Sequence, residues 1–458
     1  MNDEPVSDEP IGNEPMDNAP VDAAPPTKPL TRFIRPGEAC WTLAAYLAQG
    51  GYQGLEKALG QTQEQLLEQI TASKLRGRGG AGFPTGLKWS FMPRGASAPS
   101  PKYLIVNADE MEPGAFKDRY LLEQTPHQII EGLLIAAQTL DADTGYIFLR
   151  GDYYLAQQRL TTALAEWQAH CLENPALGPL NAKFKIHIHT SAGRYICGEE
   201  TALINAMEGK RANPRAKPPF PQVAGLWGKP TIVNNVETYC NLPHIINFGV
   251  DWYLGLGLGQ DSGTKIFGVS GRVKRPGLWE LPMGTPIREL IEVHAGGMCD
   301  GYSLKGYLPG GGSTDFLTQA HLDTPMDYDA VGRQGSRLGT GTLIVLDDSY
   351  CPIAMVLNLI RFFAQESCGW CTPCRDGLPW AEVLLNKLES GLGEAKDLDQ
   401  LEALCRFAAP GTTFCALAPG AVEPLQSALK YFRADFEAHI TQGCCPYHPS
   451  AAGEQHYG

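Results

Sequence analysis

The sequence predicts three successive units: an α/β domain with a mostly parallel sheet, a small β-grasp-like α+β domain and a carboxyl-terminal helical bundle. Strands and helices alternate from residue 76 to about 190, a pattern typical of parallel sheets covered by helices. Between 262 and 335, short strands surround a single helix, and several amphipathic segments follow within 345–440. A chain of 458 residues with 43% hydrophobic residues is long enough for roughly two to four domains.

Residues 1–31 have the composition of a disordered acidic, proline-rich tail. Residues 1–30 contain seven acidic side chains and one lysine, so this segment carries a charge of −6 out of the net charge of −13. The rest of the chain has no basic footprint for nucleic acid. The acidic, arginine-free start predicts neither a secretory nor a mitochondrial targeting segment, and no apolar run reaches the ~20 residues of a membrane span.

The elements of the first two units follow from local patterns. Residues 32–75 form an amino-terminal helical segment, with two helices expected in 41–74; the second begins with a capping box at Thr62 and Gln65. In the α/β domain, residues 76–255, a glycine-rich loop leads to the strand YLIVNA, a helix capped by Thr125, the strand GYIFLR, a helix over 153–172 and the strand FKIHIH.

The second domain, residues 262–335, combines the strands TKIFGVSG, GLWELP and LKGYLPGG with the helix PIRELIEVHAGG. After the strand GTLIVLDD, the bundle is expected to use helices at 350–366, 376–390, 397–408 and 419–440. Residues 441–458 are expected to form a loose tail.

Thirteen cysteines, an odd number in a chain without export signals, favour metal ligation over disulfides. Cys368, Cys371 and Cys374 form C-x2-C-x2-C, and Cys415 supplies a fourth thiol further along the chain. Four thiolates hold iron–sulfur clusters, and three ligands on one short segment suit zinc less well, although zinc remains the alternative. Cys405 is interpreted as core, and the Cys444–Cys445 pair as tail chemistry of no consequence.

The loop LRGRGGAGFPTGLKW, residues 75–89, is a candidate anion site. Four glycines within six positions let backbone amides approach a ligand, and Arg78 and Lys88 add positive charge. The loop is neither a P-loop nor a clean dinucleotide fingerprint, so on its own it is also compatible with an ordinary turn.

Three polar segments follow predicted strands or a glycine turn, where open α/β sheets bind ligands. Glu199 and Glu200 begin a predicted helix, so they either contact a ligand or only cap the helix dipole. The residues concerned are Asn107, Asp109, Glu110 and Glu112 after YLIVNA, Glu199 and Glu200 after the glycine turn, and Lys217, Phe220, Asn234 and Asn235 in the polar run that follows.

Taken together, these motifs resemble those of the NADH-binding F subunits of respiratory NADH:quinone oxidoreductase (complex I), the 51-kDa flavoprotein subunits of mitochondria. The segments that carry the resemblance are RGRGGAGFPTGLKW, NADEMEPGAFKDR, GRYICGEETALINAMEG, VNNVET and ESCGWCTPCRDG. It extends from about residue 35 to 440, and leaves out only the two tails.

The resemblance implies a bound flavin mononucleotide (FMN), NADH as substrate and one [4Fe-4S] cluster. FMN would contact Gly77, Arg78, Gly79, Gly80, Lys88, Asn107, Asp109, Glu110, Tyr195, Gly198, Glu199, Asn234, Asn235 and Thr238. Phe83, Phe91 and Phe220 would lie beside the adenine; Glu112, Glu200 and Lys217 would hold the polar groups of the nucleotide; and Cys368, Cys371, Cys374 and Cys415 would bind the cluster. We assign Glu112 and Glu200 to the catalytic site as positioning groups, because hydride transfer requires no acid or base.

The implied chemistry explains why these sites occur together: NADH gives up two electrons as hydride, a cluster accepts one, and a flavin does both. The implied partners are a small [2Fe-2S] thioredoxin-like subunit and the large iron–sulfur subunit of complex I, at the cytoplasmic side of the bacterial inner membrane, with membrane contact only through partners. The alternatives are a diaphorase subunit of a soluble NAD-linked hydrogenase or formate dehydrogenase, and a non-catalytic, zinc-stapled scaffold.

Overall fold

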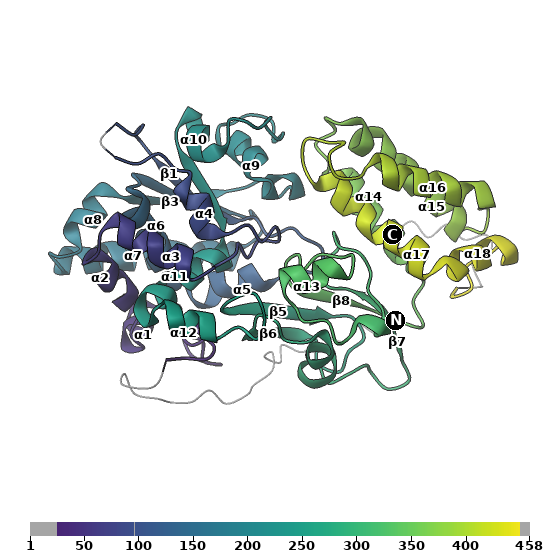
Figure 1. The fold of residues 1–458 in the computed structure, drawn as a ribbon, viewed down its shortest axis with the longest axis horizontal. Coiled ribbons are helices and arrows are strands. Elements are labelled where there is room, and N and C mark those ends of the chain that lie inside the picture. The colour runs from purple at the N-terminus through teal and green to yellow at the C-terminus, as the bar shows by residue number, and fades with distance from the viewer. Residues whose placement is uncertain (1–24, 96, 449–458) are drawn as a thin grey trace.

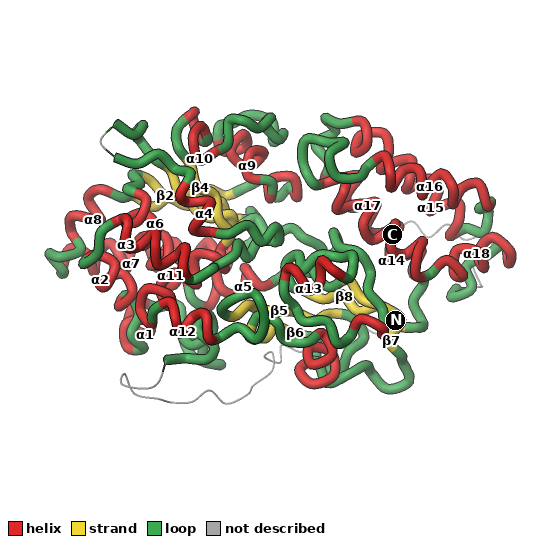
Figure 2. The backbone as a smooth tube through the Cα atoms, viewed as in Figure 1, coloured by secondary structure: helices red, strands yellow, loops and turns green. Residues whose placement is uncertain are grey.

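The computed structural model describes residues 25–95 and 97–448, arranged as two sheets and a carboxyl-terminal group of helices (Figures 1 and 2). Figure 2 shows the strands in two separate groups, with the last helices at one end of the molecule. No helix in these two ranges is both long and apolar enough to cross a membrane.

The first unit contains a four-stranded, wholly parallel sheet in the order β3-β2-β1-β4. Its strands are β1 (Tyr103–Ala108), β2 (Thr144–Leu149), β3 (Lys185–Thr190) and β4 (Thr231–Asn235). Its helices are α1 (Leu43–Ala48), α2 (Gln53–Leu59), α3 (Gln63–Ala72), α4 (Thr85–Ser90), α5 (Lys117–Gln124), α6 (Pro126–Leu140), α7 (Tyr154–Glu173), α8 (Gly178–Lys183), α9 (Glu200–Met207), α10 (Pro221–Ala224), α11 (Val236–Phe248) and α12 (Val250–Gly255), with 3₁₀ turns η1 (Tyr195–Gly198) and η2 (Leu226–Gly228).

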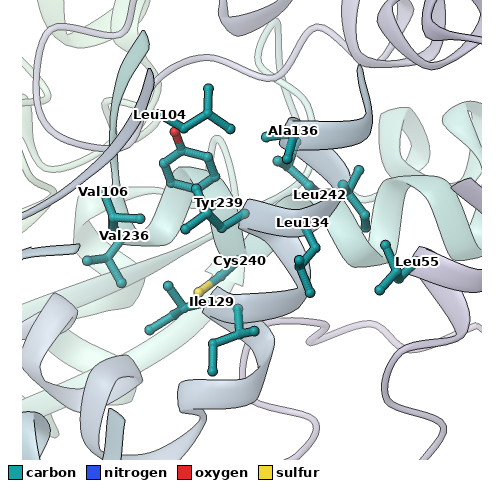
Figure 3. Close-up of a cluster of buried hydrophobic side chains, with 14 of the residues drawn as sticks. Leu55, Leu104, Val106, Ile129, Leu134, Ala136, Val236, Tyr239, Cys240 and Leu242 are labelled. Carbon is teal, nitrogen blue, oxygen red and sulfur yellow. The ribbon is translucent and has the colours of Figure 1, made fainter. Parts of the chain in front are cut away.

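The two faces of this sheet are covered differently because successive strand residues point to opposite sides. Leu104 and Val106 pack in a core with α6 and α11, part of which is shown in Figure 3. These helices approach closely: a Cβ on Gly132 of α6 would lie 2.1 Å from the carbonyl oxygen of Tyr239. Ile105 of β1 points to the other face, into a second core shared with η1, α9 and the carboxyl-terminal helices.

The second unit is a mixed sheet in the order β6-β5-β8-β7, in which β5 is parallel to β8 and the outer pairs are antiparallel. It comprises β5 (Thr264–Ser270), β6 (Gly277–Pro282), β7 (Leu304–Leu308) and β8 (Thr342–Asp347), with α13 (Tyr328–Arg333), the π-helical turn η3 (Glu289–His294) and the 3₁₀ turn η4 (Gln319–His321). The expected helix PIRELIEVHAGG is thus a π-helical turn. The strand GTLIVLDD lies inside this sheet, so the unit continues past residue 335 to Asp347.

The last unit consists of α14 (Pro352–Glu366), the π-helical turn η5 (Pro373–Gly377), α15 (Leu378–Glu389), α16 (Ala395–Phe407), α17 (Leu417–Tyr431) and α18 (Arg433–Gln442). The segment expected as one helix over 419–440 is divided into α17 and α18. Cys445 follows α18 and is buried, although it lies in the segment expected to be a loose tail.

Several amino-terminal details also differ from expectation. Residues 41–74 contain three helices instead of two, and the capping box of Thr62 and Gln65 is present. Thr125 occupies the position before α6, but its hydroxyl donates to the Leu121 carbonyl oxygen instead of capping the helix. Leu30 is fully buried, so ordered packing begins before residue 32; residues 1–24 of the expected tail lie outside the described residues.

Candidate functional site

The carboxyl ends of β1 and β4 lie side by side, and Asn107 is paired in register with Asn235. Connections from β1 proceed through β2 to β3 on one side, whereas β4 lies on the other side of β1. This is the point where the strand order reverses, and in open parallel sheets such a point opens a crevice for ligands. The polar residues predicted after YLIVNA and within VNNVET therefore meet at one edge.

The glycine-rich loop packs beside the end of β4, against residues of both the first and second units. A Cβ on Gly79 would lie 3.0 Å from Cβ of Asn235, and Gly80 has a φ of 127°, which only glycine adopts readily. The carbonyl of Gly77 accepts a hydrogen bond from the Tyr328 hydroxyl (2.7 Å). The loop backbone is thus held close to the sheet edge.

Arg78 differs from the expectation that its charge would serve an anionic ligand. Its guanidinium is fully buried and donates to the carbonyl oxygens of Ser262 (3.0 Å) and Thr264 (3.2 Å) in the second unit. Its backbone N–H donates to the Thr238 hydroxyl (2.9 Å). Thr238, another predicted flavin contact, is therefore also engaged within the protein. The Arg78 side chain therefore joins the two units, and its backbone N–H bonds within the first unit.

An ion-pair network lies next to this loop. Lys88 of α4 contacts Glu200 (Nζ–Oε2 2.8 Å), and the second oxygen of Glu200 contacts Lys217 (2.9 Å). Burial opposes the negative charge of Glu200, but the two lysines outweigh it and lower the pKa of this carboxyl. Glu199 caps α9, accepting hydrogen bonds from the N–H groups of Thr201 (2.9 Å) and Ala202 (2.8 Å), so Glu200 is not needed as a cap.

Three phenylalanines predicted beside an adenine ring remain about half exposed. Phe83 and Phe91 flank α4, and Phe220 lies with its ring centroid 6.0 Å from the ammonium of Lys217. Large exposed rings beside an ion-pair network are features of a ligand-binding surface.

Asp109 leaves one polar atom unused at the end of β1. Its Oδ1 accepts a hydrogen bond from the Ser191 hydroxyl (2.9 Å), whereas Oδ2 is buried without a partner. Burial raises the pKa of Asp109 to about 6, against the smaller lowering effects of Ser191 and Arg150. Asn107 lies nearby and donates to the Gly198 carbonyl oxygen (3.1 Å), which links this edge to η1.

Glu110 and Glu112 belong to the same motif but face different surroundings. Glu110 is buried and accepts hydrogen bonds from the N–H groups of Asp118 and Arg119 (3.1 Å each) at the start of α5; burial raises its pKa to about 7. Glu112 accepts from the Tyr195 hydroxyl and the Ser313 N–H (2.7 Å each), and burial raises its pKa. Glu110 thus orders α5, and Glu112 connects η1 to the second unit.

The two asparagines of β4 are engaged in local contacts. Asn235 caps α11 by accepting from the Glu237 N–H (3.0 Å), and its amide donates to Asp118 (2.6 Å). The Asn234 side chain can accept from the Trp89 indole N–H and donate to its neighbouring carbonyl, both at 2.9 Å. Each asparagine fixes the sheet edge that borders the crevice.

Sequence reasoning missed a buried charge network just beneath this edge. Lys117 contacts Asp118 (2.7 Å) and Glu237 (2.8 Å), and Glu237 also contacts Lys265 of the second unit (3.0 Å). Lys117 and Asp118 lie within NADEMEPGAFKDR, and Glu237 within VNNVET, so the motifs contained the signal. Their role is visible only when the segments are brought together.

The four predicted metal ligands meet at a single cavity. Cys368, Cys371, Cys374 and Cys415 all line it, together with Ile196 and Pro214 from the first unit. Burial raises the pKa of Cys374 to about 11 and of Cys415 to about 12, so a bound cation is needed to hold them as thiolates near neutral pH.

Cys405 lies in α16, is 6% exposed and does not line this cavity, which confirms its interpretation as core. All thirteen cysteines lie in the described ranges and are free of disulfides. Because Ile196 lies between Tyr195 and Gly198 in η1, the four-thiol cavity and the sheet-edge crevice share one short segment of chain. A set of four thiols that can hold a redox centre therefore lies near the carboxyl end of β1, to which Asn107 links η1.

Three regions of the chain match known protein families. Residues 70–244 match the family described as Nuo51 FMN-binding domain, residues 354–439 the NADH-ubiquinone oxidoreductase-F iron-sulfur binding region, and residues 266–314 the SLBB domain. The F subunits of the NADH-quinone oxidoreductases of Salmonella typhimurium and Escherichia coli are each 55% identical over 417 residues, which is 91% of this chain and 94% of each relative.

The corresponding F subunit of Mycobacterium tuberculosis NADH-quinone oxidoreductase is 44% identical over 414 residues, covering 89% of this chain and 93% of the relative. Among solved structures, an NAD+-reducing [NiFe]-hydrogenase in the H2-reduced state matches with a TM-score of 0.77 and 34% identity over 85% of this chain. The chain spans 64% of that hydrogenase chain.

Proposed function

The chain belongs to the family of NADH-quinone oxidoreductase F subunits, and from this premise we propose which of its residues hold each reactant. It is the flavoprotein subunit of an NADH dehydrogenase, with FMN and one [4Fe-4S] cluster as cofactors. When bound, the flavin converts two-electron hydride chemistry into the one-electron transfers that an iron–sulfur cluster accepts.

We propose that FMN occupies the crevice at the ends of β1 and β4. Three observations support its fit there: the unpartnered buried Oδ2 of Asp109, the close packing of the glycine loop against Asn235, and open space beside Gly198. Backbone of Gly77, Arg78, Gly79 and Gly80 would border the ligand, with Asn107, Asp109, Tyr195, Glu199, Asn234 and Lys88 near it. Glu110 and Thr238 would act indirectly, since both side chains bind backbone N–H groups.

NADH is proposed to lie over the surface formed by Phe83, Phe91 and Phe220. Glu200 would accept hydrogen bonds from the nucleotide, and Lys217 would donate hydrogen bonds to it. Glu112 would hold Tyr195 in place. These residues orient the donor and exclude water; none has to remove a proton for hydride to move. Glu112 and Glu200 are therefore positioning groups in this proposal.

The cluster is proposed to be held by Cys368, Cys371, Cys374 and Cys415. One observation carries the functional assignment furthest: these four thiols line one cavity together with Ile196 of η1, the segment that also borders the proposed flavin crevice. This juxtaposition gives electrons a short route out of the crevice. It also argues against a zinc staple, which would have no reason to adjoin a nucleotide site.

Gly198 provides a direct test of the flavin position. A Cβ at Gly198 would meet no heavy atom within 4 Å, so the Gly198→Leu variant should fold normally. Its leucine side chain would extend into the space proposed for FMN. We expect flavin content to fall at least about fivefold while circular dichroism and iron content are retained. Gly178→Leu, at another glycine with open space but in α8, is the matched control. Full flavin occupancy in Gly198→Leu would place FMN elsewhere.

We propose that the chain works in a complex with a small thioredoxin-like [2Fe-2S] subunit and a large iron–sulfur subunit, peripheral to the cytoplasmic side of a bacterial inner membrane. It is similar to subunits of multi-subunit complexes, which supports assembly in general. The second and third units are proposed to be a β-grasp domain and a helical bundle, consistent with the mixed sheet and with α14–α18. A hydrogenase-linked diaphorase is less well supported, because the chain covers 94% of the enterobacterial F subunits but 64% of the hydrogenase chain.

A further inference from the structure

A second group of metal-ligand side chains lies in the carboxyl-terminal helices, outside the four-cysteine cavity. Cys351, Glu389, His439 and Cys445 each bring one ligand atom to a common point, and these atoms all lie within 4.8 Å of one another. They come from separate elements: Cys351 precedes α14, Glu389 ends α15, His439 lies in α18, and Cys445 follows α18.

Three of the four side chains are enclosed by the protein. Cys351 and His439 are fully buried, Cys445 is 5% exposed, and the Glu389 side chain is 22% exposed. Among the described residues, the only ion pair of Glu389 is with His439 (3.3 Å), so no lysine or arginine neutralises this carboxylate. Two thiols, one carboxylate and one imidazole are therefore gathered at one point without a lysine or arginine of the described residues between them.

The distances match a tetrahedral ion. Cys351 Sγ lies 3.2 Å from Glu389 Oε2 and 3.5 Å from His439 Nε2, and His439 Nε2 lies 3.3 Å from Glu389 Oε2. Zinc bonds of about 2.0–2.3 Å in a tetrahedron place neighbouring ligand atoms roughly 3.3–3.8 Å apart. The three measured edges thus need shifts of only a few tenths of an ångström to enclose zinc.

The surroundings of the ligand atoms also suit metal binding. His439 Nδ1 donates to the Asp435 carbonyl oxygen (2.7 Å), so in the neutral imidazole the lone pair is on Nε2, the atom that faces the group. The Ala354 N–H at the start of α14 approaches Cys351 Sγ (3.4 Å), and the Tyr447 and His448 N–H groups lie at Cys445. These backbone donors favour the thiolate form, which burial of the two cysteines opposes.

We propose that Cys351, Glu389, His439 and Cys445 bind one structural zinc ion. Four protein ligands close the coordination sphere, which is the arrangement of structural zinc sites. The site would fasten α18 and the chain beyond it to α14 and α15. Cys445, expected from the sequence to lie in a tail of no consequence, thereby becomes a ligand, whereas Cys444 is half-exposed and outside the group.

The location gives the ion a structural task. Cys351 precedes α14 and Cys368 follows it, and Cys374 precedes α15 while Glu389 ends it. The two helices therefore carry the four-cysteine cavity at one end and the proposed zinc at the other. A 15-residue helix such as α14 is about 22 Å long, so zinc would brace the helix pair without joining electron transfer.

The alternative is a hydrogen-bonded cluster in which both thiols donate to Glu389. Metal analysis of the full-length chain separates the two. We expect about one zinc per chain in protein produced with zinc and iron. The X-ray absorption spectrum of zinc should show two sulfur neighbours at about 2.3 Å and two nitrogen or oxygen neighbours at about 2.0–2.1 Å. That spectrum requires no variant, so the test remains valid if substitutions impair folding.

Variants locate the ion. Cys445→Ser should lower zinc content at least about fivefold while iron content is kept, because a lost ligand weakens binding strongly. Cys444→Ser, one residue away, should keep both metals, and Cys371→Ser should lose iron but not zinc. A wild-type chain without zinc, a spectrum with four sulfur neighbours, or full zinc in Cys445→Ser would each overturn the proposal.

Discussion

Glu200 shows how one side chain can select between nucleotides. It lies between Lys88 (2.8 Å) and Lys217 (2.9 Å), and these lysines overcome the effect of burial and lower its pKa, which keeps it ionised. A ribose hydroxyl can donate to this carboxylate, whereas the 2′-phosphate of NADPH would meet a like charge. In a partly desolvated site such repulsion costs several kcal/mol.

We predict that Glu200→Gln relaxes this selection. The amide removes the repulsion and leaves two lysines to attract the phosphate, so kcat/KM for NADPH relative to NADH should rise at least about tenfold, equivalent to about 1.4 kcal/mol. Glu199→Gln is the matched control, because it removes the negative charge of the side chain that caps α9. This variant should lower thermal stability more than it changes the ratio of kcat/KM values for the two nucleotides. A ratio within about threefold of wild type would show that selection resides elsewhere.

Asp109 predicts a pH-dependent stability in flavin-free protein. Burial raises its pKa to about 6, above its ordinary value of 3.8, so the folded state retains a proton that the unfolded chain releases. The resulting stabilisation is complete below about pH 4 and is lost as the pH rises through about 6. Asp109→Asn should be more stable than wild type at pH 7–8, on the order of 2–3 kcal/mol.

Chemical unfolding at several pH values measures this effect. Asp399→Asn, at an exposed aspartate of α16, controls for the loss of one charge. Equal pH profiles for wild type and Asp109→Asn would mean that Asp109 is ionised at no cost in the folded protein.

At the scale of elements, the cavity between α14, η5 and the start of α17 depends on which cysteine lies on which segment. Cys371 precedes η5 and lines the cavity, whereas Cys405 is buried within α16. Cys371→Ser should abolish the paramagnetic signal of the NADH-reduced cluster, and Cys405→Ser should preserve it. Flavin reduction by NADH is expected to persist in Cys371→Ser, because hydride transfer precedes the cluster. The reverse pattern of signals would reassign the ligands.

Elements with a strong local pattern were predictable from sequence. YLIVNA is β1 because its apolar run is buried on both faces, and α14–α16 follow the helical spacing of apolar residues. β4 was missed because TIVNN is short and lies inside a polar run. Nothing local indicates that GTLIVLDD lies between β5 and β7, since a strand joins a sheet through distant partners.

The candidate sites show the same limit. The three-cysteine segment was visible because its ligands are close in sequence, and the polar strand ends were visible because parallel strands finish at one edge. The inward turn of Arg78 depends on Ser262 and Thr264 in another unit. Likewise, Cys351, Glu389, His439 and Cys445 share no spacing pattern, so only folding brings them together.

At the scale of the whole molecule, buried charges join the first two units beneath the proposed flavin crevice. Glu237 of α11 is fully buried between Lys117 (2.8 Å) and Lys265 of β5 (3.0 Å), and its Oε1 accepts from the Ile266 N–H (2.9 Å). Burial opposes its charge, but the lysines prevail and lower the pKa of Glu237 to about 2. Its stabilising effect is therefore present above about pH 4.5 and lost as the pH falls through about 2.

We predict that Glu237→Gln destabilises the chain by about 3–5 kcal/mol at pH 7, because it leaves two buried lysines without their shared counter-charge. Lys265→Met should cost less: burial outweighs the pull of Glu237 and lowers the pKa of Lys265 to about 7, so this lysine is partly neutral already. Denaturant unfolding of both variants and of the double variant completes the cycle, and the double variant should recover part of the loss. If Glu237→Gln lost less than about 1 kcal/mol, the network would contribute little to holding the units together, and their packing would have to rest on Arg78 and apolar contacts instead.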